Sequence, residues 1–202
     1  MKTLDFYFDI GSPAAYLAWT QMPALVKETG AKLNSLPFLL GGAFKATGNA
    51  SPVTIPAKGK WLIRDLQHWA AQYGLPPIKM PTNFPVNTLP FMRAMVGVQM
   101  HQPDRYQALG DALYAGMFVD GLDMNDMNVV GQVLAKAGFD PSAIMAMTQD
   151  PMIKAKLIAN TDAAIAAGVF GAPSFVVDGE LYWGQDRMHF VRKALLRFQA
   201  PL

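Results

Sequence analysis

Segments that alternate like β-strands lie only near the two ends of this chain of 202 residues, and a long helical stretch separates them. The expected strands are residues 3–8 and 32–38 on the N-terminal side, and residues 174–178 and 180–183 on the C-terminal side. Asp178 and Gly179 join the last two strands, and this dipeptide is typical of a two-residue β-hairpin. A single sheet would therefore have to combine both ends of the chain.

Helices are expected throughout the part between these strands. Ser12 followed by Pro13 is a preferred helix opening, and the apolar periodicity behind it continues to Gly30, which predicts a βαβ unit. Further helices are expected at residues 61–73, 88–101, 103–118, 125–137, 141–149 and 151–167. A last amphipathic helix is expected from Asp186 to Phe198.

This order of elements, βαβ, a helical block and then ββα, predicts an α/β protein with a thioredoxin-like fold and a large all-helical insertion. We expect residues 1–40 and 169–202 to form the thioredoxin-like domain, residues 151–168 to be its lead-in helix, and residues 41–150 to form a loop and the helical insertion. Two stretches rich in Gly and Pro, 41–60 and 76–90, are predicted loops of a kind that often lines active sites.

Charge and hydropathy exclude several classes of partner. Seventeen basic and fifteen acidic residues give a net charge of +2, too little for a surface that follows phosphates, so no nucleic-acid partner is expected. Asp5 and Asp9 interrupt the N-terminal apolar run, which argues against a signal peptide. No apolar run approaches the ~18–20 residues needed to span a bilayer. We expect a cytoplasmic protein without a membrane partner.

The chain contains no cysteine, which excludes protein disulfides, thiolate nucleophiles, thiolate-bound zinc and iron–sulfur clusters. A disulfide oxidoreductase is excluded for the same reason, because it needs a protein thiol. His68, His101 and His189 are too dispersed to predict a metal site. Any thiol chemistry must therefore come from a ligand.

Three positions could carry chemistry. Ser12 is the expected N-cap of the first helix, where backbone N–H groups favour an anion; alternatively it only caps the helix, for about 1 kcal/mol. If the Ala172-Pro173 bond is cis, the N–H and C=O of Ala172 face outward and can pair with an extended peptide. Asp186 either caps the last helix or binds a ligand's ammonium group.

Several separated segments resemble a known family. They read FYFDIGSPAAYLA, FLLGGAFKATGN, IPAKGK, GVFGAPSF and WGQDR, and they span nearly the whole chain. In order and spacing they are similar to the 2-hydroxychromene-2-carboxylate isomerases and the related kappa-class glutathione transferases. Those proteins resemble DsbA-type oxidoreductases in fold, and they are commonly dimeric. The resemblance implies the same fold, and a homodimer, for this chain.

The resemblance also implies a glutathione site. The thiol of glutathione would lie near Ser12, whose hydroxyl donates to the sulfur while the helix N-terminus stabilises the thiolate; both lower the thiol pKa. Asn49 and Lys58 would bind the peptide backbone and the glycyl carboxylate. Ala172, before a cis-Pro173, would pair with the cysteinyl amide. The γ-glutamyl end would lie among Trp183, Gly184, Gln185 and Asp186.

The implied activity is glutathione-dependent isomerisation in aromatic catabolism. A hydroxychromene carboxylate and its ring-opened trans-hydroxybenzylidene pyruvate interconvert, because transient addition of the thiolate to the conjugated double bond permits rotation. Lys45 would bind the carboxylate of the aromatic substrate, with Trp61 and Phe84 as pocket walls. The alternative for Lys45 is ordinary solvation, and for Trp61 and Phe84 it is packing in the core.

Two other functions stay open. The loop after Asn49, ASPVTIPAKG, is closer to that of a kappa-class transferase, and Phe84 lacks the hydroxyl that a Tyr would offer. The loop favours a kappa-like glutathione transferase or peroxidase as the alternative enzyme, whereas Phe84 only removes a hydrogen bond to a polar substrate. A non-catalytic thiol-binding or peptide-binding module is the third hypothesis. We rank the isomerase first.

Overall fold

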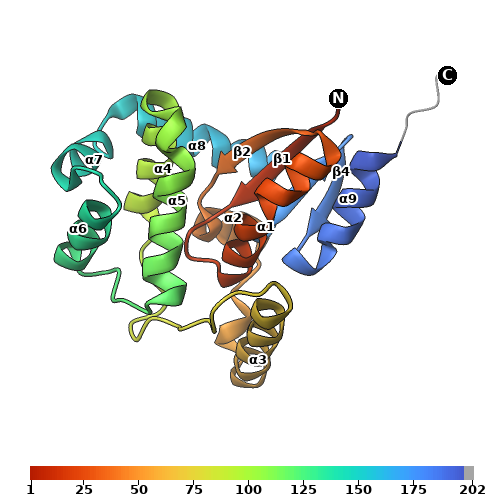
Figure 1. The fold of residues 1–202 in the computed structure, drawn as a ribbon, viewed down its shortest axis with the longest axis horizontal. Coiled ribbons are helices and arrows are strands. Elements are labelled where there is room, and N and C mark those ends of the chain that lie inside the picture. The colour runs from red at the N-terminus through yellow and green to blue at the C-terminus, as the bar shows by residue number, and fades with distance from the viewer. Residues whose placement is uncertain (198–202) are drawn as a thin grey trace.

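The computed structural model describes residues 1–197, and four strands in it form one mixed sheet in the order β2-β1-β3-β4 (Figure 1). The central strand β1 (Thr3–Phe8) runs parallel to β2 (Lys32–Pro37) and antiparallel to β3 (Ser174–Val177). The edge strand β4 (Glu180–Trp183) pairs antiparallel with β3. The sheet therefore joins both ends of the chain, as the strand patterns predict.

The apolar face of β1 anchors the core. Leu4, Phe6 and Phe8 are completely buried, and the ring of Phe6 stacks at 5.2 Å on Phe8 and at 5.3 Å on Phe175 of β3. The register pairs Phe6 directly with Phe175, which places these two rings opposite each other across the strands. This packing fixes β1, and the loop at its end carries Ser12.

Two helices cover this sheet close to that loop. α1 (Pro13–Thr29) begins after Ser12 and ends at Gly30, whose φ of 64° is the left-handed conformation that glycine adopts readily. α9 (Met188–Leu196) lies beside α1 and follows a 3₁₀ turn at Gln185–Arg187 (Figure 1). The helix expected from Asp186 therefore begins at Met188, and its expected end at Phe198 lies outside the described residues.

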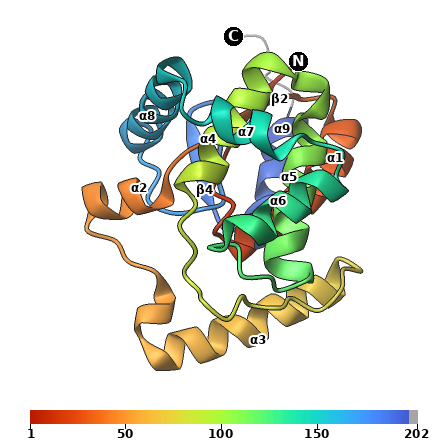
Figure 2. The same cartoon turned by 90° about the vertical axis from the view of Figure 1, so that its left-hand side faces the viewer.

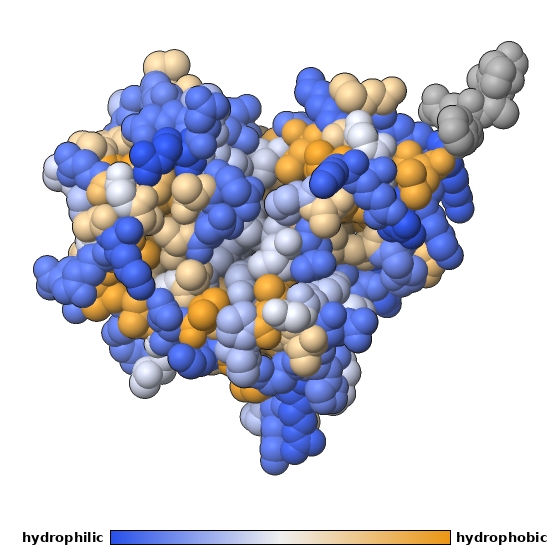
Figure 3. Space-filling view, in the orientation of Figure 1, coloured by the Kyte–Doolittle hydropathy of each residue, from blue (hydrophilic) through white to orange (hydrophobic). Residues whose placement is uncertain are grey.

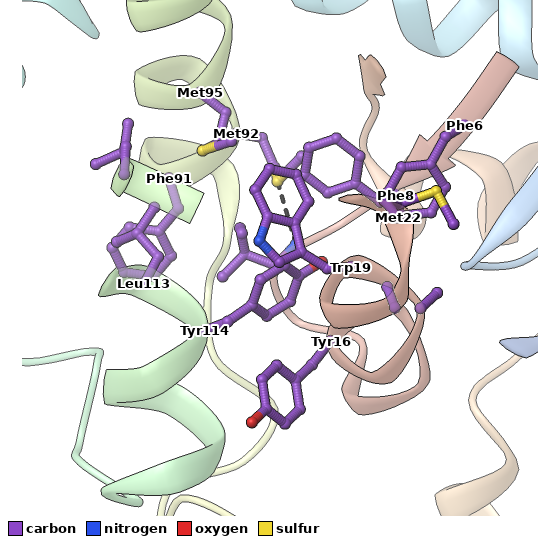
Figure 4. Packing of buried hydrophobic residues seen from close by; sticks show 14 of the residues in the cluster. Phe6, Phe8, Tyr16, Trp19, Met22, Phe91, Met92, Met95, Leu113 and Tyr114 are labelled. Atoms are coloured by element: carbon purple, nitrogen blue, oxygen red, sulfur yellow. Dashed lines mark hydrogen bonds between the residues drawn. The ribbon is translucent and has the colours of Figure 1, made fainter. Parts of the chain in front are cut away.

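The remaining predicted helices gather mainly beside the sheet (Figures 1 and 2). They are α4 (Leu89–His101), α5 (Tyr106–Tyr114) with a π-helical turn at Ala115–Val119, α6 (Met127–Lys136), α7 (Pro141–Met147) and α8 (Pro151–Ala166). Tyr114 of α5 packs at 5.7 Å from Trp19 of α1, so one core joins the helical block to the sheet layer (Figure 4). Within residues 1–197, no helix combines the length and the apolar character needed to cross a bilayer.

Two helices occupy part of the predicted loop 41–60, and this expectation was wrong. α2 (Leu40–Thr47) forms in the first half, and α3 starts at Pro56 and ends at Gln72, extending beneath the rest of the molecule (Figure 2). Gly42 is a poor helix former, but a Cβ built there would lie only 3.1 Å from the Thr161 methyl of α8. Close packing against α8 therefore outweighs the low helix propensity of this segment.

Candidate functional site

Ser12 lies between the end of β1 and the start of α1 and is 6% exposed. Its Oγ accepts a hydrogen bond of 3.1 Å from the Ala15 N–H, which confirms the capping role. The Ser12 N–H donates to the Asp9 carbonyl oxygen at 3.0 Å, which closes the turn. The positive end of the α1 dipole therefore lies at the Ser12 side chain, where a negative charge is stabilised.

The Ser12 hydroxyl also reaches the loop before β3. It donates a hydrogen bond of 2.8 Å to the carbonyl oxygen of Ala172, and the Ala172-Pro173 bond is cis, as the resemblance implies. The carbonyl that was expected to face outward thus accepts from Ser12 in this structure, and its pairing with a peptide stays a prediction. The Ala172 N–H has no hydrogen-bond acceptor within residues 1–197, so it is the group that an extended peptide could pair with.

Asn49 is brought to the same loop as Ala172. Its side-chain amide donates to the Phe170 carbonyl oxygen at 2.8 Å, and the rings of Phe170 and Trp183 pack with their centroids 5.0 Å apart. The Gly184 N–H donates to the Pro173 carbonyl oxygen at 3.0 Å. The structure thus gathers half of the predicted site near the N-terminus of α1: Ser12, Asn49, Ala172, Pro173, Trp183 and Gly184.

Asp186 follows at the edge of this group. The N-cap of α9 is Arg187 and no side chain caps that helix, so the expectation that Asp186 caps it was wrong. Its carboxylate instead pairs with Arg187 and lies so close to Gly184 that a Cβ built there would collide with it, and the Gly184 φ of 100° also favours glycine. The Asp186 carboxylate is 38% exposed, which leaves it accessible to a ligand.

Asp65 of α3 and Tyr73, which directly follows α3, adjoin Asp186, although the sequence did not single them out. The Tyr73 hydroxyl donates to the Gln185 carbonyl oxygen at 3.4 Å. Burial and then the Asp186 charge raise the pKa of Tyr73 to about 12, and the same two causes raise the pKa of Asp65. The negative potentials of the Asp65 and Asp186 carboxylates therefore add up between them, and this favours a cation there. The helix expected at residues 61–73 contains both positions, but its apolar periodicity does not single them out, because their approach to Asp186 depends on tertiary packing.

Four predicted residues have no hydrogen bond to this group within residues 1–197. Lys45, Lys58 and Trp61 are exposed on α2 and α3, with Trp61 64% exposed, so Trp61 is not a core residue. Phe84 is partly buried against the main core, which confirms its packing role. The contacts of these four residues with a ligand or substrate stay predictions.

Two hollows in the described surface lie away from Ser12. One of about 400 Å³ adjoins the β3–β4 hairpin and is lined by Lys2 and Asp178, which form a salt bridge of 2.8 Å. The other, of about 290 Å³, lies where β1, β2 and α1 meet α4 and α5, and the surface is visibly indented between the sheet and the helical block (Figure 3). Within residues 1–197, no three His, Asp or Glu side chains are placed to hold a metal ion.

Residues 3–196 match the family described as DSBA-like thioredoxin domain, and the chain therefore belongs to that family. It is 31% identical to the 2-hydroxychromene-2-carboxylate isomerase of Sphingobium xenophagum over 197 residues, 96% of this chain and 98% of that protein. It is 26% identical to glutathione S-transferase kappa 1 of Rattus norvegicus over 202 residues, 94% of this chain and 89% of that protein. A solved 2-hydroxychromene-2-carboxylate isomerase superposes with a TM-score of 0.81 at 27% identity, covering 96% of this chain and 94% of the other. These matches confirm the resemblance and the thioredoxin-like fold.

Proposed function

We propose that this protein is a glutathione-dependent isomerase of aromatic keto acids like 2-hydroxychromene-2-carboxylate, acting in aromatic catabolism. One observation carries the proposal: the Ser12 hydroxyl, at the N-terminus of α1, lies 2.8 Å from the carbonyl oxygen of Ala172. An anion-stabilising position therefore adjoins a peptide-binding position, and glutathione is a peptide with a thiol. The isomerase relatives support the choice of reaction.

The described residues fit glutathione. The Ala172 N–H has no acceptor among the described residues and suits the carbonyl oxygen of the cysteine residue. Asp186, with Asp65 nearby, suits the γ-glutamyl ammonium group. Asn49 beside Phe170 suits the peptide backbone, and the exposed Lys58 suits the glycyl carboxylate. The γ-glutamyl ammonium group and the glycyl carboxylate are thus each assigned a group of opposite charge.

Bound glutathione supplies a thiolate that adds reversibly to the conjugated double bond of the substrate. The chain's own task is to generate and hold that thiolate. The Ser12 hydroxyl turns from the Ala172 carbonyl to donate to the sulfur, and the dipole of α1 adds to its effect, so both lower the thiol pKa. In this proposal Lys45 binds the substrate carboxylate, while Trp61 and Phe84 flank the aromatic ring.

A pH titration of the thiolate absorbance tests this function. Glutathione is added to the wild-type protein and to Ser12→Ala, and isomerisation of a benzylidene pyruvate is then followed with and without glutathione. A thiol pKa below that of unbound glutathione in the wild type and higher in Ser12→Ala than in the wild type, together with glutathione-dependent isomerisation, supports the proposal. Failure of glutathione to accelerate the isomerisation contradicts it.

A kappa-class-like glutathione transferase or peroxidase is the second candidate. The kappa-like loop after Asn49 and the 26% identity to a kappa transferase favour it. Conjugation of a chloronitrobenzene, lost in Ser12→Ala, would identify this activity. Tight binding of glutathione with an unshifted thiol pKa would instead identify a non-catalytic thiol-binding or peptide-binding module.

We also propose that the protein acts as a homodimer in the cytoplasm. Light scattering of the purified protein at two concentrations tests the assembly, and fractionation of the producing cells tests the location. A monomer at both concentrations contradicts the first proposal, and recovery outside the cytoplasmic fraction contradicts the second.

A further inference from the structure

Asp9 is a buried acid directly behind the Ser12 loop. It is 2% exposed and follows the last residue of β1. Its Oδ1 accepts from the Gly11 N–H and its Oδ2 from the Leu40 N–H, both at 2.9 Å. A buried carboxylate is costly unless its oxygens are hydrogen-bonded, and here donors from two separate segments satisfy one oxygen each.

A third segment reaches the same carboxylate. Thr88 occupies the N-cap position of α4 but makes no capping bond with its side chain, and its hydroxyl lies near enough to Asp9 to lower the pKa of that carboxyl. The fit is close, because a Cβ built on Gly11 would lie 2.8 Å from the Thr88 methyl. Burial raises the pKa of the Asp9 carboxyl, against the lowering effect of these three donors.

These three segments surround the site. Gly11 immediately precedes Ser12, and Leu40 is the first residue of α2, the helix that carries Lys45 and leads to Asn49. The side chain at position 9 needs two acceptor oxygens, because the Gly11 N–H and the Leu40 N–H each donate to a different oxygen of Asp9. An asparagine has one oxygen and would lose one of the two bonds. The chemistry of the position therefore calls for a carboxylate.

The geometry points to Asp9 as a positioning residue: its carboxylate ties the Ser12 loop to the first N–H of α2 and so sets Ser12 relative to the segment that ends at Asn49. This inference rests on the proposed function, since its consequence is measured on glutathione bound at Ser12. Asp9 does not reach the reacting atoms, because it lies on the buried side of the loop. It acts through the backbone of Gly11 and Leu40.

One pair of variants removes the Asp9–Leu40 bond without touching Asp9. Leu40 is the first residue of α2, where proline is favoured, and Leu39 has φ −90° and ψ 108°, which a residue before proline adopts readily. Leu40→Pro deletes the N–H together with the leucine side chain. Leu40→Ala removes most of the same side chain but keeps the N–H. The difference between the two variants therefore isolates the hydrogen bond.

We expect Leu40→Pro to lower kcat about tenfold relative to Leu40→Ala, with KM changed less than kcat, because small displacements of positioned groups are costly in rate. The thiol pKa of bound glutathione should rise by about half a unit in Leu40→Pro only. Equal kcat and equal thiol pKa in the two variants would overturn the inference. The wild-type titration tests the proposed function separately, because it involves neither variant.

Asp9→Asn gives a second measurement, with Asp5→Asn as its control. Asp5 lies on β1, the strand that Asp9 follows, and accepts from the Asn34 amide, away from Ser12. Asp9→Asn should change kcat and the thiol pKa as Leu40→Pro does, whereas Asp5→Asn should change neither. Lower resistance to urea in Asp9→Asn, with kcat and thiol pKa of the folded protein unchanged, would show a purely structural role and overturn the inference. If Asp9→Asn does not fold, the two Leu40 variants decide.

Discussion

The hydrogen bond between Ser12 and Ala172 joins two residues that are 160 positions apart in the chain, at 2.8 Å. Ser12 opens α1, and Ala172 lies in the loop before β3, so this bond connects the N-terminal βαβ unit to the C-terminal hairpin. The same oxygen accepts from the Ala15 N–H. One hydroxyl therefore holds both the helix start and the loop that we propose to bind glutathione.

Ser12→Ala should lose both bonds and the effect on the thiol. We expect a loss of about 2 kcal/mol in the free energy of unfolding, about 1 from the cap and about 1 from the hydrogen bond to Ala172. Turnover should fall and the thiol pKa of bound glutathione should rise, while the glutathione Kd changes by less than about tenfold. Urea unfolding, calorimetry and the absorbance titration measure these quantities. Ser12→Thr, which keeps the hydroxyl, is the control; equal turnover in wild type and Ser12→Ala would remove Ser12 from the mechanism.

Asp186→Asn should act on glutathione affinity rather than on turnover. The carboxylate is 38% exposed, so solvent screening limits the loss to about 1 kcal/mol, or about fivefold in Kd. Titration calorimetry measures it, and cysteinylglycine, which lacks the γ-glutamyl group, is the control ligand. Wild type and variant should bind the dipeptide equally. A defect confined to kcat would show that the γ-glutamyl end lies elsewhere.

Gly11→Ala should destabilise the fold at the Ser12 loop. The new Cβ would lie 2.8 Å from the Thr88 methyl, and such overpacking costs about 1–3 kcal/mol. Thr88→Ser removes that methyl and keeps the hydroxyl that faces Asp9. The double variant should therefore recover most of the lost stability in urea unfolding, a coupling that independent sites do not show. Additive effects of the two changes would mean that the methyl is not the obstacle.

Local sequence patterns predicted the elements whose causes are local. The hairpin at Asp178-Gly179 formed as expected, with φ of 51° and 82° at these two residues, which an Asp-Gly turn accommodates. The Ser12 cap also formed as expected, because its hydrogen bond joins residues only three positions apart. α2 was missed because its glycines argue against a helix, whereas tertiary contacts, among them its packing on α8 and the bond from the Leu40 N–H to Asp9, stabilise one.

The long-range part of the site could not be predicted in this way. Whether Asp65 and Tyr73 adjoin Asp186 depends on where α3 packs, and no periodicity within α3 encodes that position. Asp9 did leave a signal, because it is the one charged residue in the apolar run YFDI and its carboxylate had to find buried donors. A lone acidic residue at the end of a buried strand therefore predicts that buried N–H donors lie around its carboxylate.

Tyr73 should make stability depend on alkaline pH. Burial and the Asp186 charge raise its pKa in the folded protein to about 12, above its ordinary value of 10. The folded state thus holds this proton more tightly than the unfolded state, so the contribution is complete below pH 10 and is lost as the pH rises through about 12. Tyr73→Phe should lack this loss. Urea midpoints of wild type and Tyr73→Phe between these pH values measure it, and tyrosinate absorbance reports the ionisation. If the urea midpoints of wild type and Tyr73→Phe change in parallel across this pH range, Tyr73 ionises like an exposed tyrosine.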